Sequence, residues 1–412
     1  MSAVQKHVIV IGGGASGMIA AIAAAGKGAK VTILERNPRI GKKILATGNG
    51  RCNYTNINTD ITCYHGHHPR FAYSALAGFN VQKTLNFFEK LGITPKVEES
   101  GKVFPMSDQA SSVLDVLMYA LKEAGVNIVC DAYVQKITKA AQVFKVHLEK
   151  GPSFEGDSVI LAAGGKAMPS SGSDGSAYQL AEKLGHHITN IFPALVQIKL
   201  EGTFFKQIEG VKVVGSAEIL HHNKTIAQDQ GDILFANYGV SGPPILQISR
   251  KAGELLQENK EVILKLNILD SLTKEKLKEI LTTRFGNNSQ KTLEFSLVGL
   301  INKRLIPVIL KETGLTNIKG PAASVSPPER EKILTILQDW RFKVRGTKSW
   351  PSAQVTAGGI NTKEINPNTM ESKIVPSLFF AGEIIDIDGM CGGYNLQWAW
   401  SSGFTAGKNA AL

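Results

Sequence analysis

The sequence lacks any apolar run long enough to cross a membrane, which takes roughly 18 residues. Its opening segment, HVIVIGGGASGMIAAIAAAG (residues 7–26), is apolar but is interrupted by glycines. It also has neither a cationic start nor a convincing cleavage site, so it does not read as a signal peptide. We interpret it as part of a fold and expect a cytoplasmic protein with no membrane partner.

Cysteine is scarce, with four residues that are far apart in the sequence and form no CxxC motif. This excludes a disulfide framework and a zinc site of the usual spacing, and it fits a reducing compartment. Three histidines lie within residues 65–68, but no cluster of carboxylates or thiolates completes a ligand set with them, so we expect no metal. The cysteines are Cys52, Cys63, Cys130 and Cys391.

Acidic residues are also in deficit, with 35 Asp and Glu against 46 Lys and Arg and a formal net charge of +11. Such an excess favours polyanionic partners, although an ordinary solvated basic surface is the simpler explanation. The chain has 412 residues, and a single core rarely grows past roughly 250 to 300 residues. We therefore expect a protein of more than one domain.

Residues 7–36 predict a βαβ unit, with an apolar strand, a glycine turn, an alanine-rich helix and a second strand ending at Glu35. Gly12, Gly14 and Gly17 form GxGxxG in the context that dinucleotide binding requires. Gly12 permits the tight turn, Gly14 lets the pyrophosphate approach the backbone, and Gly17 lets the helix pack on the strand. A carboxylate at Glu35 favours a free ribose 2′-hydroxyl, which indicates NAD or FAD rather than NADP.

Two further strands run into glycines, at SVILAAGG (residues 158–165) and in the segment 377–411. With the glycine turn of the βαβ unit, the chain has three widely separated places where a strand runs into glycines. Three such strand-to-glycine crossings could converge on one long ligand. In the last crossing Glu383 offers an acceptor for a ribityl hydroxyl, while Gly392 and Gly393 precede a helix whose N-terminus could face the flavin ring. FAD explains this pattern better than NAD does.

The chain resembles a family of bacterial FAD-dependent oxidoreductases along nearly its whole length. The resemblance is carried by VIVIGGGASGMIAAIAAA, GKKILATGNGRCNYTN, VILAAGG, ILFANYGVSGPPILQIS and GGYNLQWAWSSG. Members of the family are described as aminoacetone oxidases, bile-acid C=C reductases and ribosomal-RNA dihydrouridine synthases. One departure is that Ala236 and Asn237 stand where the family often has a Thr-His pair, so no proton-transfer role carries over from that histidine.

By this resemblance the loop at residues 41–56 folds along FAD, with Lys43 near the phosphates, whereas the alternative is a solvated basic loop. The expected cofactor-binding residues are Gly12, Gly14, Ala15, Ser16, Gly17, Glu35, Arg36, Lys43, Gly48, Gly50, Arg51, Cys52, Asn53, Val134, Ala163, Gly164, Gly382, Glu383, Gly392, Gly393, Tyr394 and Asn395.

The expected fold class is α/β, a discontinuous Rossmann-like FAD-binding domain with an inserted β domain and a small helical subdomain. Residues 191–265 look strand-like, and helices are expected at 271–286, at 292–314 and after Ser326, where Glu329 completes a capping box. The expected boundaries are 1–190 and 352–412 for the FAD domain, 191–271 for the β domain, 272–340 for the helical subdomain and 341–351 for a return strand.

Catalytic candidates lie beside the expected flavin ring. Cys391 directly precedes the glycines of the last helix, and a thiol at a helix N-terminus can act as an acid or nucleophile. Tyr394 and Asn395 complete the set, more as groups that shape the pocket than as reactants. Packing is the simpler reading for both Cys391 and Cys52.

The segment WRFKVRGTKSW (residues 340–350) alternates cations with aromatics. On a strand this alternation would present the cations on one face, with aromatics available for base stacking. The simpler alternative is an amphipathic strand with a solvated basic face and buried aromatics.

We expect an FAD-dependent enzyme that reduces an activated C=C bond with NAD(P)H bound only transiently, because no second GxGxxG with a following acid occurs. The family and the charge favour uracil in ribosomal RNA, with RNA contacting a basic surface. The rivals are a small-molecule amine oxidase or enone reductase and, in another class, an RNA-binding flavoprotein with structural FAD.

Overall fold

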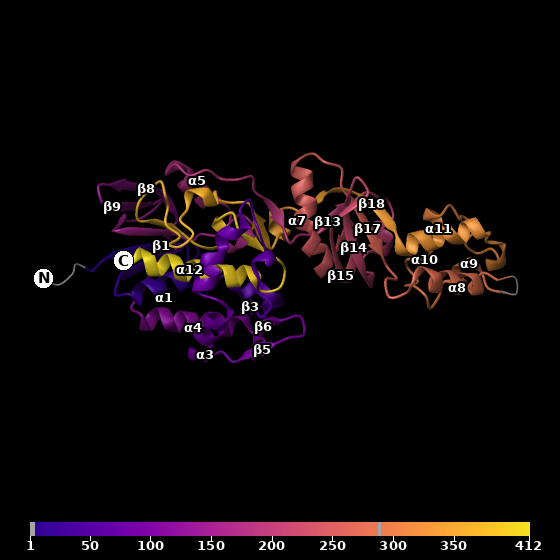
Figure 1. The fold of residues 1–412 in the computed structure, drawn as a ribbon, viewed down its shortest axis with the longest axis horizontal. Coiled ribbons are helices and arrows are strands. Elements are labelled where there is room, and N and C mark those ends of the chain that lie inside the picture. Colours follow the sequence, from indigo (N-terminus) through magenta and orange to yellow (C-terminus); the bar gives the residue numbers. More distant parts are fainter. Residues whose placement is uncertain (1–4, 287–289) are drawn as a thin grey trace. The chain divides into compact units, whose positions relative to one another are not determined.

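The computed structural model describes residues 5–286 and 290–412. The chain divides into two compact units. Unit 1 contains the residues up to Phe192 together with Ala353–Leu412, and unit 2 contains Pro193–Ser352 (Figure 1). The chain therefore leaves unit 1 once and returns to it once.

Unit 1 is built on a five-stranded sheet with the order β20-β11-β1-β2-β7, in which every neighbouring pair is parallel. Apart from the edge strand β7, its apolar strands are almost wholly buried, as a parallel sheet covered on both faces requires. The strands are β1 (His7–Ile11), β2 (Lys30–Leu34), β7 (Asn127–Val129), β11 (Ser158–Leu161) and β20 (Leu378–Phe380).

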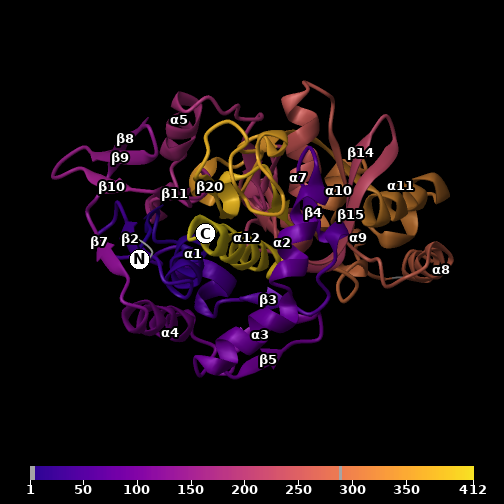
Figure 2. The ribbon, with the colours of Figure 1, turned by 60° about the vertical axis from the view of Figure 1, so that its left-hand side comes forward.

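Two helices from opposite ends of the chain, α1 (Ala15–Ala25) and α12 (Tyr394–Ala410), lie side by side in this unit (Figure 2). Glycines make the approach possible. A Cβ on Gly403 would lie 2.4 Å from the Ser16 carbonyl oxygen, and one on Gly407 would lie 2.1 Å from that of Ala20. The helices thus meet backbone to backbone.

The remaining elements of unit 1 form small sheets and covering helices. The sheets are β10-β9-β8, β3-β6-β5 and β21-β4. The bounds are β3 (Thr55–Asn56), β4 (Tyr64–His65), β5 (Pro95–Val97), β6 (Lys102–Pro105), β8 (Val134–Ala140), β9 (Val143–Leu148), β10 (Phe154–Gly156), β19 (Val355–Ala357), β21 (Asp388–Gly389), α2 (Tyr73–Gly78), α3 (Val81–Lys90), α4 (Ala110–Glu123) and α5 (Ser176–Lys183).

Unit 2 contains a closed barrel with the order β13-β16-β15-β14-β17-β18, in which neighbours pair antiparallel. One continuous apolar core joins the barrel to the helices that follow it. The bounds are β13 (Ile198–Leu200), β14 (Lys212–His221), β15 (Lys224–Ala236), β16 (Gly239–Ser241), β17 (Ile263–Asn267), β18 (Trp340–Thr347), α6 (Phe205–Ile208), α7 (Pro243–Gln257), α8 (Lys274–Arg284), α9 (Leu293–Ser296), α10 (Ile306–Glu312) and α11 (Pro327–Gln338), with β12 (Phe192–Ala194) at the point of entry.

Two local expectations were wrong. Residues 191–265, read as strand-like, contain the 15-residue helix α7, whose two N-terminal prolines start it without needing an N–H donor. The single amphipathic helix expected at 292–314 is broken into α9 and α10, with Pro307 at the second start. The capping box of Ser326 and Glu329 at α11 is confirmed.

Gly407→Ala should destabilise unit 1, because the new methyl group would collide with the Ala20 carbonyl oxygen and force α12 away from α1. Overpacking of this kind costs about 1–3 kcal/mol. Thermal unfolding followed by circular dichroism should show a Tm several degrees lower. Lys408→Ala, which removes an exposed side chain from the same helical turn, is the matched control. Equal Tm values for the two variants would contradict the close packing.

Candidate functional site

The glycine turn between β1 and α1 forms an open cradle. Gly12 has a φ of +104°, and a Cβ there would lie 2.7 Å from the Ala162 carbonyl oxygen. Gly17 passes so close to the turn that a Cβ would lie 1.9 Å from the Gly12 oxygen. In contrast, nothing lies within 4 Å of a Cβ on Gly14, the N-cap of α1, and no side chain caps that helix. The first N–H groups of α1 therefore face a space suited to a phosphate.

Glu35 lies at the end of β2 and is buried, with 7% of its surface exposed. One carboxylate oxygen accepts the Gly13 N–H at 2.8 Å, and the other accepts the backbone and side-chain N–H groups of Asn37 at 2.8 and 2.7 Å. A carboxylate has about four lone-pair positions. The remaining one can accept a ribose hydroxyl, and the three bonds hold the group in place for it.

Two other expected residues around this strand end have protein partners. The Arg36 guanidinium forms an ion pair with Asp174 at 2.5 Å and lies 4.9 Å from the centre of the Tyr133 ring. Val134 is a buried core residue of β8. Neither side chain contacts the Gly14 cradle through a hydrogen bond.

The glycine segments that follow β1, β11 and β20 meet at one edge, because all three strands are parallel neighbours. Gly12 abuts Ala162 and Ala163. A Cβ on Gly382 would lie 2.5 Å from the Ser16 hydroxyl, which donates to the Ala381 carbonyl at 3.3 Å. The sequence analysis expected these three crossings to converge on one ligand, and the structure brings them together.

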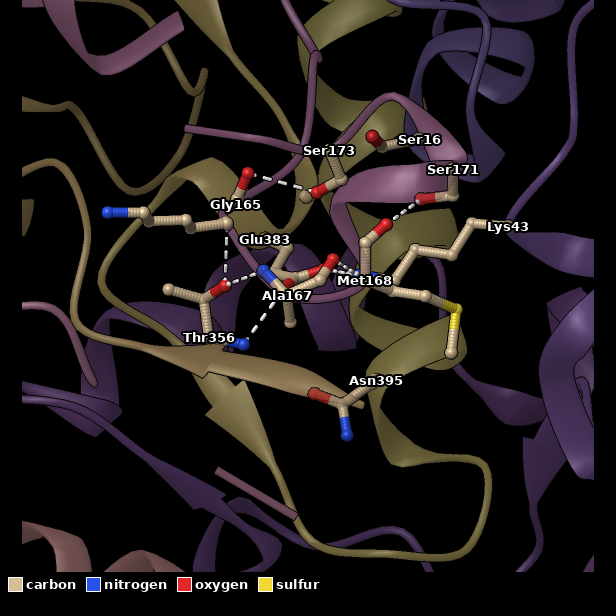
Figure 3. A network of polar contacts seen from close by, with 12 residues as sticks. Ser16, Lys43, Gly165, Ala167, Met168, Ser171, Ser173, Thr356, Glu383 and Asn395 are labelled. Atoms are coloured by element: carbon tan, nitrogen blue, oxygen red, sulfur yellow. Dashed lines mark hydrogen bonds and ion pairs between the residues drawn. The ribbon is translucent and has the colours of Figure 1, made fainter. Parts of the chain in front are cut away.

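Glu383 is the centre of a polar network (Figure 3). Its carboxylate accepts the Lys43 ammonium at 2.7 Å and the Thr356 N–H at 2.8 Å. The Thr356 hydroxyl, which is buried, accepts the backbone N–H groups of Lys166 and Ala167 at 2.7 and 2.9 Å. Lys43 also donates to the Ala167 carbonyl at 3.2 Å. The network ties the loop at 41–56, the segment after β11 and the segment after β20 into one wall.

Sequence reasoning missed Thr356. It lies in the segment QVTAGGI (residues 354–360), where the chain returns to the first domain. Its glycine pair, with φ of +82° and +155°, was the available signal that this strand also ends at the site.

The loop at 41–56 is irregular, as its lack of periodicity indicated. Gly48, Asn49, Gly50 and Cys52 all have positive φ, between 56° and 84°. For Asn49 and Cys52 such values are uncommon and mark a backbone held by its surroundings. Gly48 fits against the Asn53 N–H, from which a Cβ would be only 2.7 Å away.

Arg51, which the sequence analysis expected to bind the cofactor, is paired with carboxylates of the protein. Its guanidinium pairs with Glu98 at 2.8 Å and Asp108 at 3.4 Å and lies over the Phe104 ring at 3.9 Å. These carboxylates raise the pKa of Arg51, the Glu98 hydrogen bond most of all. Arg51 therefore fixes the loop to the β5–β6 segment.

Cys52 is fully buried, and desolvation raises the pKa of its thiol to about 12. The thiol is therefore neutral at physiological pH and unsuited to act as a nucleophile. Its neighbour Asn53 is also buried, and the side-chain oxygen of Asn53 has no hydrogen-bond partner among the described residues. A buried acceptor of this kind fits an N–H donor of a ligand.

The N-terminus of α12 lies next to this acceptor. Gly393, its N-cap, has a φ of +102°, and a Cβ there would lie 2.8 Å from the Asn53 oxygen. No side chain caps α12. The side-chain amide of Asn395 accepts the Gly389 N–H and donates to the Gly389 carbonyl, both at 2.8 Å. Asn395 therefore stabilises the turn that carries Cys391.

Tyr394 packs edge-on against Tyr64 at 6.3 Å, and desolvation raises the pKa of its phenol to about 12. Tyr394 is thus a neutral hydrogen-bond donor. Cys391 is partly exposed, in contrast to Cys52. Of the two thiols expected near the ring, the geometry favours Cys391 for chemistry.

Together these features supply the groups that one extended ligand would contact. They are the uncapped N-terminus of α1, the carboxylates of Glu35 and Glu383, and the uncapped N-terminus of α12 beside the unpartnered oxygen of Asn53. FAD needs a ribose acceptor, phosphate donors, ribityl acceptors and a positive helix end at the reducible ring. The residues present fit that cofactor.

Across residues 5–286 and 290–412, no group of three or more His, Cys, Asp or Glu side chains could hold a metal ion. None of the four cysteines, all of which lie in the described part of the chain, forms a disulfide. No helix in the described part of the chain has the length and apolar character that crossing a membrane requires.

Thr356→Val should weaken FAD binding about tenfold or more, because the Lys166 and Ala167 N–H groups would lose their acceptor and the segment after β11 would shift to pair them elsewhere. FAD binding must then restore the wall and leave a buried donor unpaired, which costs about 1–3 kcal/mol, and 1.4 kcal/mol corresponds to tenfold. Thr356→Ser keeps the hydroxyl and should bind FAD almost as wild type does. Quenching of flavin fluorescence on titration into apoprotein measures both. Equal affinity of the valine and serine variants would contradict a role for the hydroxyl.

Comparison with known proteins places this site in context. A family model described as "HI0933-like protein Rossmann domain" matches residues 6–409. A "3-dehydro-bile acid delta(4,6)-reductase" of Clostridium scindens is 40% identical over 411 residues, covering 99% of each chain. Proteins named "Ribosomal RNA dihydrouridine synthase" are 29% identical in Escherichia coli, with 97% of each chain covered, and 30% identical in Haemophilus influenzae, with 96% covered. The chain therefore belongs to the HI0933-like family and is an FAD-dependent oxidoreductase.

Proposed function

We propose that this enzyme reduces a C=C bond conjugated to a carbonyl group, and that its substrate is uracil in ribosomal RNA. The observation that carries the proposal is the match along nearly the whole chain to relatives whose names denote this one reaction type. A bile-acid Δ4,6 reduction and the formation of dihydrouridine both saturate a C=C bond beside a carbonyl. The shared chemistry supports the reaction more strongly than it supports either substrate.

Bound FAD supplies the hydride chemistry. The chain must then hold the carbonyl and deliver a proton to the carbon next to it. Cys391 is the proposed proton donor, because it is the partly exposed thiol at the start of α12. The neutral phenol of Tyr394 and the amide of Asn395 shape the same end of the site. NAD(P)H is the proposed electron source, bound transiently.

The choice of RNA is supported by charge. Unit 2 carries 23 Lys and Arg against 16 Asp and Glu, so it contributes most of the net +11. A polyanion binds such a surface with affinity that falls as salt rises. The 40% identity to a bile-acid reductase favours a second candidate, a small polycyclic dienone.

An anaerobic reoxidation experiment tests the proposal. Chemically reduced enzyme should be reoxidised by ribosomal RNA from a strain that lacks the gene, and nucleoside mass spectrometry should then find new dihydrouridine. RNA from a strain that carries the gene is the control and should leave the flavin reduced. Reoxidation by a steroid dienone but not by RNA would show that the substrate is a small polycyclic dienone and not uracil in ribosomal RNA. If neither accepts electrons while O₂ does, C=C reduction itself is wrong and oxidase activity takes its place.

Cys391→Ser should slow single-turnover reduction of the C=C bond by at least about tenfold, because a hydroxyl is a far weaker acid than a thiol and general acid catalysis contributes about 10² to 10⁴. Flavin reduction by NAD(P)H should keep its wild-type rate. Cys130→Ser, another partly exposed thiol, which follows β7 and not α12, is the matched control. Stopped-flow absorbance separates the two half-reactions. A wild-type rate in Cys391→Ser would exclude Cys391 as the donor.

A further inference from the structure

We propose that unit 2 binds a single-stranded segment of RNA on one outer face of its barrel. The barrel basic surface consists of Lys199 on β13, Tyr238 in the turn between β15 and β16, and Lys343, Arg345 and Lys348 on and after β18. The inference rests on the proposed RNA substrate and adds the place where the RNA is held.

The aromatic residues Trp340 and Phe342 do not form this surface. Along β18 the side chains alternate, so Trp340 and Phe342 point into the barrel core with 3% and 5% exposure. Trp340 packs on Phe204 and Phe235, and Phe342 packs on Phe205. The stacking role that the sequence pattern suggested for these two rings is wrong. Their burial, however, fixes the cations of the same strand on the outer face.

Neighbouring strands add to the cations of β18. Lys199 is exposed on β13 and lies opposite Gly346 in the antiparallel register. The Lys348 N–H donates to the Gln197 carbonyl at 2.9 Å, which holds the end of the basic segment against β13. The outer face of the β13–β18 pair is therefore a continuous basic strip.

Tyr238 supplies an aromatic ring beside the strip. Its carbonyl accepts the Leu200 N–H at 2.9 Å, so the turn is attached to β13. The Lys348 ammonium lies 4.6 Å from the centre of the ring, and the ring is half-buried. A cation next to an aromatic side chain is the pairing that binds phosphate and unpaired base together.

Carboxylates do not cancel the charge of this strip. Within the described ranges, Glu201 is the acid paired with it, bound to Arg345 at 2.9 Å. Arg345 is the main cause that lowers the pKa of Glu201, and Lys343 contributes at longer range. Farther along the barrel, Arg341 is bound by Asp339 and Lys265 by Glu218, so those cations are compensated. A second carboxylate, Glu209, lies near the ring end of the surface, where burial and then this charge raise the pKa of Tyr238. The strip itself keeps four cations against its one paired carboxylate, an arrangement whose self-repulsion an anionic ligand would relieve.

The backbone of the strip is also open to a ligand. The register of β13 with β18 shifts between Lys199 and Leu200, which pair with Gly346 and Val344 and leave Arg345 as the extra residue of a bulge. Bulges re-aim side chains and are frequent at functional sites. Nothing lies within 4 Å of a Cβ on Gly346, whose φ is +151°. A phosphate can therefore approach the strand between Lys199 and Arg345.

The test compares two triple variants in the full-length enzyme with bound FAD. The first replaces Lys199, Lys343 and Lys348 by Ala. The control removes three exposed lysines from unit 1, Lys90→Ala, Lys122→Ala and Lys183→Ala, and so makes the same change in net charge. Binding of a fluorescent, unstructured RNA oligonucleotide is measured by anisotropy at several salt concentrations. The slope of log K against log salt should fall by about 2 in the first variant, at about 0.7 per lost phosphate contact, and should be unchanged in the control.

Tyr238 separates RNA recognition from simple attraction of any polyanion. Tyr238→Ala should weaken RNA binding roughly tenfold through lost stacking, whereas Tyr238→Phe keeps the ring and should bind as wild type does. Binding of heparin, which has no bases, should be the same in both. If Tyr238→Ala loses heparin and RNA equally, or loses neither, the surface does not recognise RNA.

The outcomes also distinguish this surface from the proposed reaction, because binding is measured without turnover. If the first triple variant binds RNA like the control, the proposal that this surface binds RNA is wrong. The proposal that the enzyme forms dihydrouridine is not tested by that result and stands or falls with the reoxidation experiment. If the surface is correct, this variant loses reduction of RNA yet reoxidises with a small enone at the wild-type rate. A wild-type enzyme that binds the oligonucleotide with no salt dependence would overturn the proposal outright.

Discussion

The close approach of backbones at the carboxyl edge of the parallel sheet is the constraint on which the site depends. Gly12 touches Ala162, Gly382 touches Ser16, and Gly403 of α12 touches the carbonyl of that same serine. Each contact leaves no room for a Cβ, so three distant parts of the chain can meet only because glycine stands at each. The packing that stabilises unit 1 is therefore also what assembles the walls of the cofactor site.

Much of the charge near the cofactor is satisfied by the protein itself. Lys43 is bound by Glu383, Arg36 by Asp174, and Arg51 by Glu98 and Asp108. Such partly exposed pairs add little to stability one by one. Their effect here is geometric, since they hold the loop at 41–56 and the segment after β11 in place without a ligand. Binding then costs less ordering of the chain.

The features that the sequence predicted are those with local causes. The βαβ unit around Gly12 follows from strand, turn and helix patterns within thirty residues. The capping box at Ser326 follows from a pattern of four residues. The features that the sequence analysis missed depend on hydrogen-bond and ion-pair partners that are distant in the sequence. Nothing near Thr356 in the sequence reveals that its hydroxyl binds the backbone at Lys166, and nothing near Arg51 reveals Glu98. Helix α7 was misread because its flanking strands set the expectation, although its prolines mark a helix start.

The hydrogen bond from Lys348 to Gln197 joins the first and last strands of the barrel. The 160 residues of unit 2 therefore begin and end at neighbouring points. For the folding of unit 1, the insertion of unit 2 is equivalent to a short loop that joins these two points. Loop closure costs grow only slowly with length, and domains with adjacent termini are readily inserted into others. The architecture is compatible with the acquisition of unit 2 in a single genetic insertion that left the fold of unit 1 intact.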